Sequence, residues 1–123
     1  MAIRVLVVDD TDHVREVVAA MLRLDGFDVV GTAADGDGAV ALAETTDPHV
    51  VVMDLKMPGM DGLEATRRLC AARPGQRVVL YTAYLDAEIQ RQASEAGAAL
   101  CLEKVDGLPR LERELHRLTL GRD

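Results

Sequence analysis

Five short apolar runs alternate with segments of helical periodicity along the chain. The runs are rich in Val, Ile and Leu and cover 3–8, 27–32, 50–53, 78–81 and 98–102. Strands this apolar are usually buried on both faces, and regular alternation of strand and helix is typical of a parallel sheet covered by helices. The sequence therefore predicts an α/β fold in one doubly wound (βα)5 domain, with helices on both faces of a five-stranded sheet.

Helix signals fill the intervals between the runs. We expect a first helix capped by Asp12 and ended by Gly26, with an apolar face of Val14, Val17, Val18, Met21 and Leu22. Further helices are expected at 39–44, at 63–73 after a cap by Asp61, and at 86–96. The last helix has Pro109 in its first turn and a leucine stripe at positions 108, 111, 115 and 118.

Composition narrows the classes of function. The 123 residues suit one domain, 1–123, and no apolar stretch is long enough to span a membrane, so we expect a soluble chain. A net charge of −7 argues against nucleic acid or an anionic membrane as the main partner. The two cysteines, Cys70 and Cys101, form no metal-binding pattern, and they fit the reducing cytoplasm.

Polar residues whose side chains can bind ions or take part in a reaction follow four of the five predicted strands. They are Asp9 and Asp10, then Asp54, Thr82 and Lys104. In a doubly wound sheet of order 2-1-3-4-5 the ligand crevice opens at the carboxyl ends of strands one and three, and these side chains would meet there. Three clustered carboxylates repel one another unless a cation lies among them, and oxygen ligands at an open, hydrated site suit Mg²⁺ together with a phosphoryl oxygen.

Four stretches carry a family resemblance: "VLVVDDTDHVRE", "VVMDLKMPGMDG", "VVLYTAY" and "EAGAALCLEK". Over nearly its whole length the chain resembles the response-regulator receiver domain of two-component signalling, which has the flavodoxin-like fold with strand order 2-1-3-4-5. The resemblance implies a phosphoprotein that takes phosphate from a histidine kinase or phosphotransfer protein. It also implies an effector domain or a homodimer partner, and no turnover of a separate substrate.

The resemblance also implies a role for each site residue. Asp54 would be the nucleophile that becomes an aspartyl phosphate, and Mg²⁺ would be bound by Asp10, Asp54 and the backbone carbonyl of Lys56, with Asp9 acting partly through a water. The Thr82 hydroxyl and the Ala83 backbone N–H would hold phosphoryl oxygens, and Lys104 would pair with the phosphate. Such roles fit in-line phosphoryl transfer, in which positioning and charge neutralisation supply most of the catalysis.

One departure from the family pattern keeps an alternative open. Receivers usually have Tyr or Phe three residues before the late lysine, and here that residue is Cys101. A thiol is too small to replace the ring, so the switch is expected to be weakened, with Tyr84 as a candidate substitute. The alternative function is a non-phosphorylated interaction module. A haloacid dehalogenase-type phosphohydrolase, suggested by the Asp10-x-Asp12 pair, is a weaker alternative because Asp54 would have no role in it.

Overall fold

A computed structural model describes residues 2–119 of the chain. Five strands form its centre: β1 (Arg4–Val8), β2 (Asp28–Ala33), β3 (Val50–Met53), β4 (Arg77–Thr82) and β5 (Leu100–Glu103). All neighbouring strands are parallel, and their order is β2-β1-β3-β4-β5. This confirms the predicted fold class and strand order. The two ends of the domain predicted over 1–123 lie outside the described residues.

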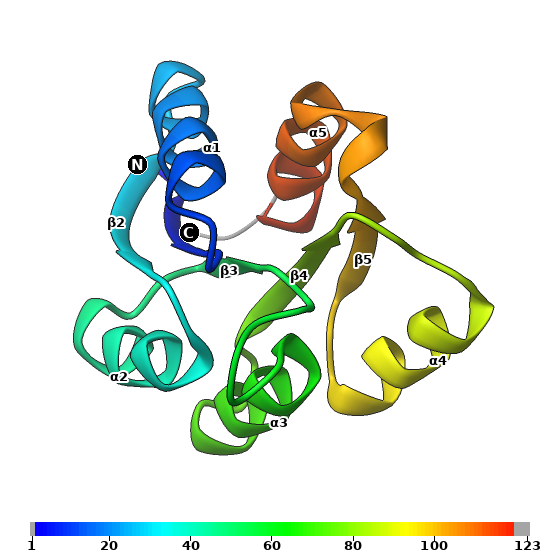
Figure 1. The fold of residues 1–123 in the computed structure, drawn as a ribbon. Coiled ribbons are helices and arrows are strands. Elements are labelled where there is room, and N and C mark those ends of the chain that lie inside the picture. The colour runs from blue at the N-terminus through cyan, green and yellow to red at the C-terminus, as the bar shows by residue number, and fades with distance from the viewer. Residues whose placement is uncertain (1, 120–123) are drawn as a thin grey trace.

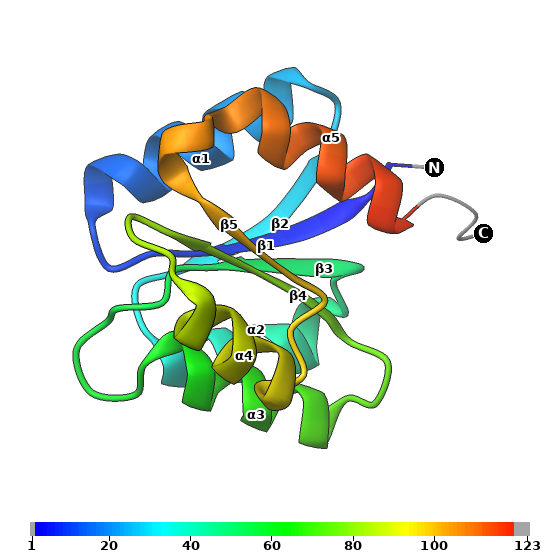
Figure 2. The same cartoon turned by 90° about the vertical axis from the view of Figure 1, so that its right-hand side faces the viewer.

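Five α-helices cover the two faces of the sheet. They are α1 (Asp12–Leu24), α2 (Gly36–Thr46), α3 (Gly62–Ala72), α4 (Ala87–Ala96) and α5 (Leu108–Thr119), and a short 3-10 turn, η1 (Lys104–Asp106), precedes the last. Helices α1 and α5 lie on one face, and α2, α3 and α4 lie on the other (Figures 1 and 2). No helix in the described part of the chain is long and apolar enough to cross a membrane.

Alternation along the strands divides the apolar side chains between two cores. On β1, Val5 and Val7 belong to the core under α1 and α5, whereas Leu6 and Val8 belong to the core over α2, α3 and α4. Successive side chains of a strand point to opposite faces, so a strand that is apolar at every position fills both cores. All four residues of β3 are buried for this reason.

Two predicted helix boundaries are wrong. Thr11, not Asp12, is the N-cap residue of α1, and Asp12 is the first residue of the helix. Helix α2 begins at Gly36 rather than at 39, because the side chain of Asp35 accepts a hydrogen bond of 2.7 Å from the backbone N–H of Gly38. That cap supports a first turn whose glycines have low helix propensity, so periodicity alone did not reveal it.

The predicted apolar face of α1 is correct only in part. Val18 and Leu22 are buried as expected, but Val17 and Met21 are 39% and 40% exposed. Ala19 is buried instead, so the helix contacts the core through a narrower stripe than the apolar residues alone suggest. The other caps behave as predicted: the Asp61 side chain caps α3, and Gly97 ends α4 in the left-handed conformation.

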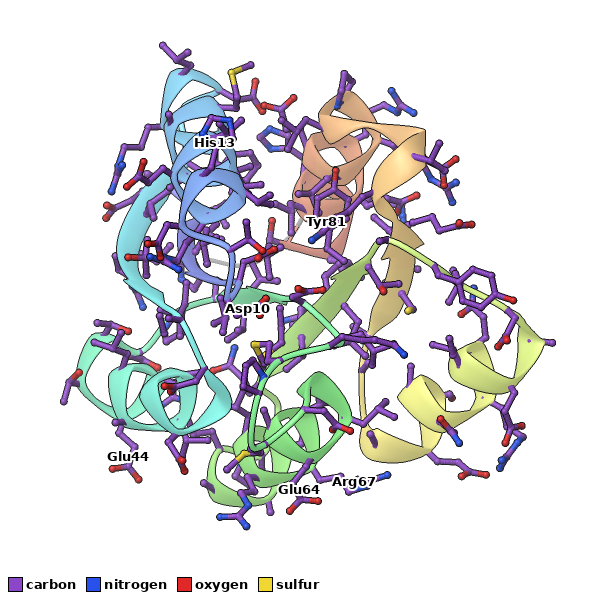
Figure 3. The ribbon with its side chains drawn as sticks, viewed as in Figure 1. Asp10, His13, Glu44, Glu64, Arg67 and Tyr81 are labelled. Atoms are coloured by element: carbon purple, nitrogen blue, oxygen red, sulfur yellow. The ribbon has the colours of Figure 1, made fainter. Side chains whose placement is uncertain are left out.

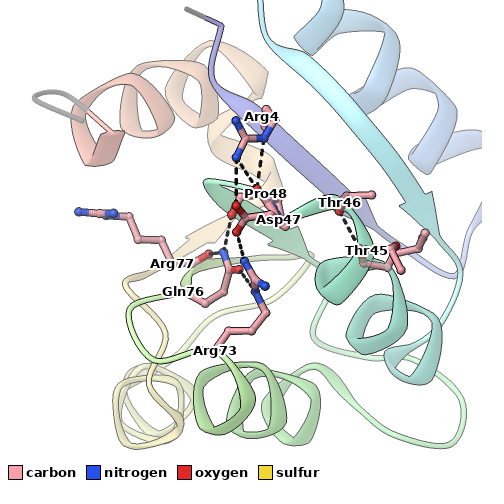
Figure 4. Close-up of polar contacts among 9 residues, drawn as sticks. Arg4, Thr45, Thr46, Asp47, Pro48, Arg73, Gln76 and Arg77 are labelled. Carbon is pink, nitrogen blue, oxygen red and sulfur yellow. Dashed lines mark hydrogen bonds and ion pairs between the residues drawn. The ribbon is translucent and has the colours of Figure 1, made fainter. Parts of the chain in front are cut away.

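The amino ends of the strands are held by a separate polar cluster around Asp47 (Figure 4). Asp47 follows α2 with φ of 48°, and its carbonyl accepts a hydrogen bond of 2.7 Å from Nη2 of Arg4. Its carboxylate pairs with Arg73, which follows α3. The hydrogen bond and charge of Arg73 lower the pKa of Asp47. These contacts join the first residue of β1 to the loops that follow α2 and α3, at the edge of the sheet opposite to the predicted site.

Candidate functional site

Strand register brings Asp9 and Asp54 to the same level of the sheet. Val8 of β1 is paired with Met53 of β3, so the next residue of each strand lies just beyond the last paired position. The backbone N–H of Asp54 donates a hydrogen bond of 2.9 Å to the carbonyl of Val8, which continues the ladder by one step. Two acids that are far apart in the sequence therefore end neighbouring strands together.

Lys104 completes the contact from the end of β5. Its ammonium lies 2.8 Å from Oδ2 of Asp9 and 3.7 Å from Oδ1 of Asp54. Asp9, Asp54 and Lys104 each come directly after the last residue of a strand and continue the face under α1 and α5. The residues two before each of them, Val7, Val52 and Leu102, belong to that core. Alternation thus explains why these three side chains meet.

The carboxylates of Asp9, Asp10 and Asp54 form a compact group. One oxygen of each lies within 4.8 Å of the corresponding oxygens of the other two. Asp9 is 4% exposed and Asp10 is exposed, so the group runs from the buried edge of the sheet to solvent. Figure 3 shows Asp10 between the layer that holds α1 and the layer that holds α2 and α3. An all-oxygen donor set that is open to water on one side fits Mg²⁺.

The charges in this group oppose one another. Burial raises the pKa of Asp54, the nearby Lys104 charge lowers it, and the charges of Asp9 and Asp10 raise it again, so the pKa of this carboxyl is above its ordinary value. Burial lowers the pKa of Lys104, but the hydrogen bond that Lys104 donates to Asp9 and the charge of Asp54 outweigh that effect and raise the pKa overall. A lysine held as a cation among three carboxylates neutralises only part of their charge, so the group still attracts a further cation.

A tight loop follows Asp54. The backbone N–H of Gly62, the first residue of α3, donates a hydrogen bond of 2.7 Å to the carbonyl of Leu55. A Cβ on Gly62 would lie only 2.3 Å from the carbonyl oxygen of Asp54, so no larger residue fits there. Gly59, in the middle of the loop, has φ of +74°. Close approach at one glycine and a left-handed turn at the other fold the loop back against the end of β3.

The remaining predicted residues lie at the same edge of the sheet. Thr82 ends β4 and is 3% exposed, and its hydroxyl accepts a hydrogen bond of 3.4 Å from the backbone N–H of Tyr84. Ala83 and Lys56 are exposed in the loops that follow β4 and β3. Thr82 has the strand parity of Leu80, so it continues the opposite face of the sheet from Asp54. The geometry therefore brings the three acids and Lys104 together, whereas Thr82, Ala83 and Lys56 share only the edge of the sheet with them.

Sequence reasoning missed two residues beside this group. Nη1 of Arg15 donates a hydrogen bond of 2.7 Å to the backbone carbonyl of Asp9. The ring centroid of Tyr81, a buried residue of β4, lies 6.0 Å from the Lys104 ammonium. Arg15 stands inside the quoted stretch "VLVVDDTDHVRE", one turn into the first helix, and this position was the available signal. Nothing in the sequence distinguished Tyr81 from an ordinary strand residue.

Cys101 is buried on β5 in the core over α2, α3 and α4, on the same face as Thr82. A surface hollow of about 200 Å³ lies beside it and is lined by α4 residues such as Ala93. Tyr84, the candidate substitute for the missing ring, is 61% exposed. Neither core contains an aromatic ring at the position that the family pattern assigns to one.

Comparison with known proteins identifies the family. The family model described as "Response regulator receiver domain" matches residues 5–116. The chain belongs to this family. It is 42% identical to the response regulator GacA of Pseudomonas protegens over 120 residues, which is 97% of this chain and 56% of GacA. The receiver domain thus spans little more than half the length of that relative.

Solved receiver structures share the fold. The signal receiver domain of NarL, a response regulator of Mycobacterium tuberculosis, has 34% identity and a TM-score of 0.91, with 98% of each chain covered. A chain from the CheX–CheY–BeF3–Mg²⁺ complex of Borrelia burgdorferi has 26% identity and a TM-score of 0.83, covering 95% of this chain and 87% of that one. The family and the fold expected from the four sequence stretches are therefore confirmed.

Proposed function

We propose that this receiver domain is a phosphoacceptor in two-component signalling, and that Asp54 takes phosphate from the phosphohistidine of a histidine kinase or phosphotransfer protein. One observation carries the proposal: the Asp54 carboxylate stands within 4.8 Å of two further acids and 3.7 Å from the Lys104 ammonium. A carboxylate beside a lysine and a divalent-ion donor set is the arrangement that phosphoryl transfer requires.

The transfer makes one bond and breaks one. A carboxylate oxygen of Asp54 attacks the phosphorus, the P–N bond to the donor imidazole breaks, and its electron pair returns to the ring nitrogen, which then takes up a proton from solvent. Asp54 needs no general base because its nucleophilic form is already deprotonated. The product is an acyl phosphate on Asp54, and its later hydrolysis returns the carboxylate. No turnover of a separate substrate is part of the proposal.

The remaining residues position the phosphoryl group. Lys104, already paired with both acids, supplies a point charge to a phosphoryl oxygen. The Thr82 hydroxyl and the Ala83 backbone N–H would bind other phosphoryl oxygens. Mg²⁺ would be held by Asp10, Asp54 and the carbonyl of Lys56, with Asp9 acting partly through a water. When bound, the ion would neutralise part of the negative charge of the acids and the phosphoryl group.

The cellular setting is also part of the proposal. Receiver domains work with histidine kinases and effector domains, and we propose that this chain does so in the cytoplasm as one domain over 1–123, with an effector domain or a second copy as its output partner. Both cysteines, Cys70 and Cys101, are free thiols, which is compatible with that compartment.

Phosphorylation by acetyl phosphate tests the assignment. The native chain is incubated with and without Mg²⁺, and the phosphoryl adduct is measured by intact-protein mass spectrometry. Asp54→Asn is the test variant. Asp86→Asn is a matched control, because Asp86 is the N-cap of α4 and Asn is an equally good cap. We expect Mg²⁺-dependent labelling of the native chain and the control, and none of Asp54→Asn. Labelling that survives in Asp54→Asn would refute the assignment.

A non-phosphorylated interaction module remains the second candidate, because Cys101 replaces the ring that usually reads out the phosphorylated state. Its distinguishing outcome is the absence of labelling in the native chain under conditions that label another receiver. The chain has every charged residue that the phosphoacceptor site needs, and this favours the phosphoacceptor function.

A further inference from the structure

Asp9 is held at each of its four polar atoms. Its backbone N–H donates to the Ala33 carbonyl at 3.1 Å, and its Oδ1 accepts from the Thr11 backbone N–H at 2.9 Å. Its Oδ2 accepts from Lys104 at 2.8 Å. Its carbonyl oxygen accepts from Nη1 of Arg15 at 2.7 Å. The first three hydrogen bonds fix the end of the strand and the side chain of Asp9, whereas the bond from Arg15 fixes the peptide group between Asp9 and Asp10.

The guanidinium of Arg15 spans the whole loop between β1 and α1. While Nη1 holds the Asp9 carbonyl, Nη2 pairs with Oδ1 of Asp12 at 2.6 Å. The Arg15 side chain is 16% exposed, although that of Asp12 is 80% exposed. A planar guanidinium that is anchored at two of its nitrogens has a defined orientation.

The peptide that Arg15 holds is the one that carries Asp10. The Asp9 carbonyl and the Asp10 nitrogen belong to one planar unit, so fixing the carbonyl oxygen also fixes the direction in which the Asp10 backbone leaves. Asp10 itself is exposed, yet one of its carboxylate oxygens stands within 4.8 Å of those of Asp9 and Asp54. Its place in the group thus depends on its backbone.

We propose that Arg15 is a positioning residue for the cation site: it holds the Asp9–Asp10 peptide so that the Asp10 carboxylate faces Asp54. This inference rests on the proposed function, since the cation that the site would take is the Mg²⁺ of phosphoryl transfer. Arg15 touches neither the phosphoacceptor nor the phosphoryl group in this role. Like residues that hydrogen-bond to metal ligands, it would act by orienting a ligand, and here it does so through the Asp9 carbonyl.

The sign of the effect separates positioning from simple electrostatics. Arg15 is a cation close to a cation site, so removing its charge would by itself strengthen Mg²⁺ binding. Removing a positioning contact would weaken it, typically by ~10-fold or more for residues that orient metal ligands. The two effects have opposite directions, and a single affinity measurement therefore decides between them.

Isothermal titration calorimetry with MgCl₂ on the metal-free chain provides that measurement. The variants are Arg15→Met, which removes the charge and both arms, and Arg15→Lys, which keeps the charge and one possible donor. Arg91→Met is the matched control, because Arg91 also contacts two partners through its guanidinium, the exposed acids Glu88 and Glu95, but does so on α4. We expect Kd to rise about 10-fold in Arg15→Met, to rise less in Arg15→Lys, and to stay unchanged in Arg91→Met.

Failure of this inference and failure of the proposed function give different results. If the native chain binds no Mg²⁺, the cation site of the proposed function is refuted. If the native chain binds Mg²⁺ and Arg15→Met binds it equally well or more tightly, only the positioning role is refuted. Should Arg15→Met fail to fold by circular dichroism, Arg15→Lys decides, because native affinity in that variant would overturn the role and weaker affinity would support it.

Discussion

Asp54→Asn should make the metal-free receiver more stable and the Mg²⁺-bound receiver less stable than the native chain. The Asn side chain has the same shape as Asp but no charge. With an effective dielectric constant of about 20, the repulsion between Asp54 and Asp9 at up to 4.8 Å is about 3.5 kcal/mol. The attraction of Lys104 at 3.7 Å is about 4.5 kcal/mol on the same scale. Taken together, these two contributions favour the charged form of Asp54 by about 1 kcal/mol.

Burial and Asp10 then decide the balance. The exposed Asp10 adds a repulsion of about 1 kcal/mol, close to its value in water, which offsets that margin, so burial of the Asp54 carboxylate decides the sign. Burial is also the main cause that raises the pKa of Asp54 above its ordinary value. We therefore expect Asp54→Asn to raise the free energy of unfolding by about 1 kcal/mol in EDTA at neutral pH. At 100 times its Kd, Mg²⁺ should stabilise the native chain by about 2.7 kcal/mol and the variant much less.

The pH dependence gives an independent check of the sign. A carboxyl whose pKa is raised in the folded state binds more protons there than in the unfolded state, so its contribution to stability falls as pH rises from the ordinary aspartate value to the raised one. Native chain and variant should thus differ little at low pH and diverge as pH rises. Urea unfolding followed by far-UV circular dichroism, in EDTA and in excess Mg²⁺, measures this, with Asp86→Asn as control. A variant less stable than the native chain in EDTA would refute the charge balance.

Three further predictions concern the loop, the core and the switch. Gly62→Ala should lower the free energy of unfolding by about 3 kcal/mol, because the added Cβ would lie 2.3 Å from the carbonyl oxygen of Asp54. Gly59→Ala adds its Cβ to open space and should cost only about 1 kcal/mol. Urea titrations measure both costs, and equal costs would contradict the close approach at Gly62. Leu115→Ala should cost about 3 kcal/mol, since Leu115 is fully buried on the side of α5 that faces the core, and a cost below about 1 kcal/mol would contradict that packing. With Cys101 in place of a ring, phosphorylation should change the sedimentation coefficient little, and a large shift would show that another group relays the signal.

The fold could be predicted well because both of its periodicities are local. Buried parallel strands are apolar at every position, and helices repeat their apolar residues on one side, so alternation of the two patterns is visible without any long-range information. Errors arose where a single hydrogen bond decided the outcome, as at the Asp35 cap of α2. They also arose where neighbouring elements decided how wide a face was buried, as for Val17 and Met21 on α1.

The sequence by itself determined which residues stand at the carboxyl ends of the strands, because the ends of the apolar runs mark Asp9, Asp54, Thr82 and Lys104 directly. Only the tertiary structure decided which of these meet. Strand register and face alternation bring Lys104 to Asp9 and Asp54 and turn Thr82 to the opposite face. The position of Arg15 one turn into α1 was visible in the sequence, but its contact with the Asp9 carbonyl was not, since that contact joins a side chain to a backbone atom and depends on the angle at which α1 leaves the sheet.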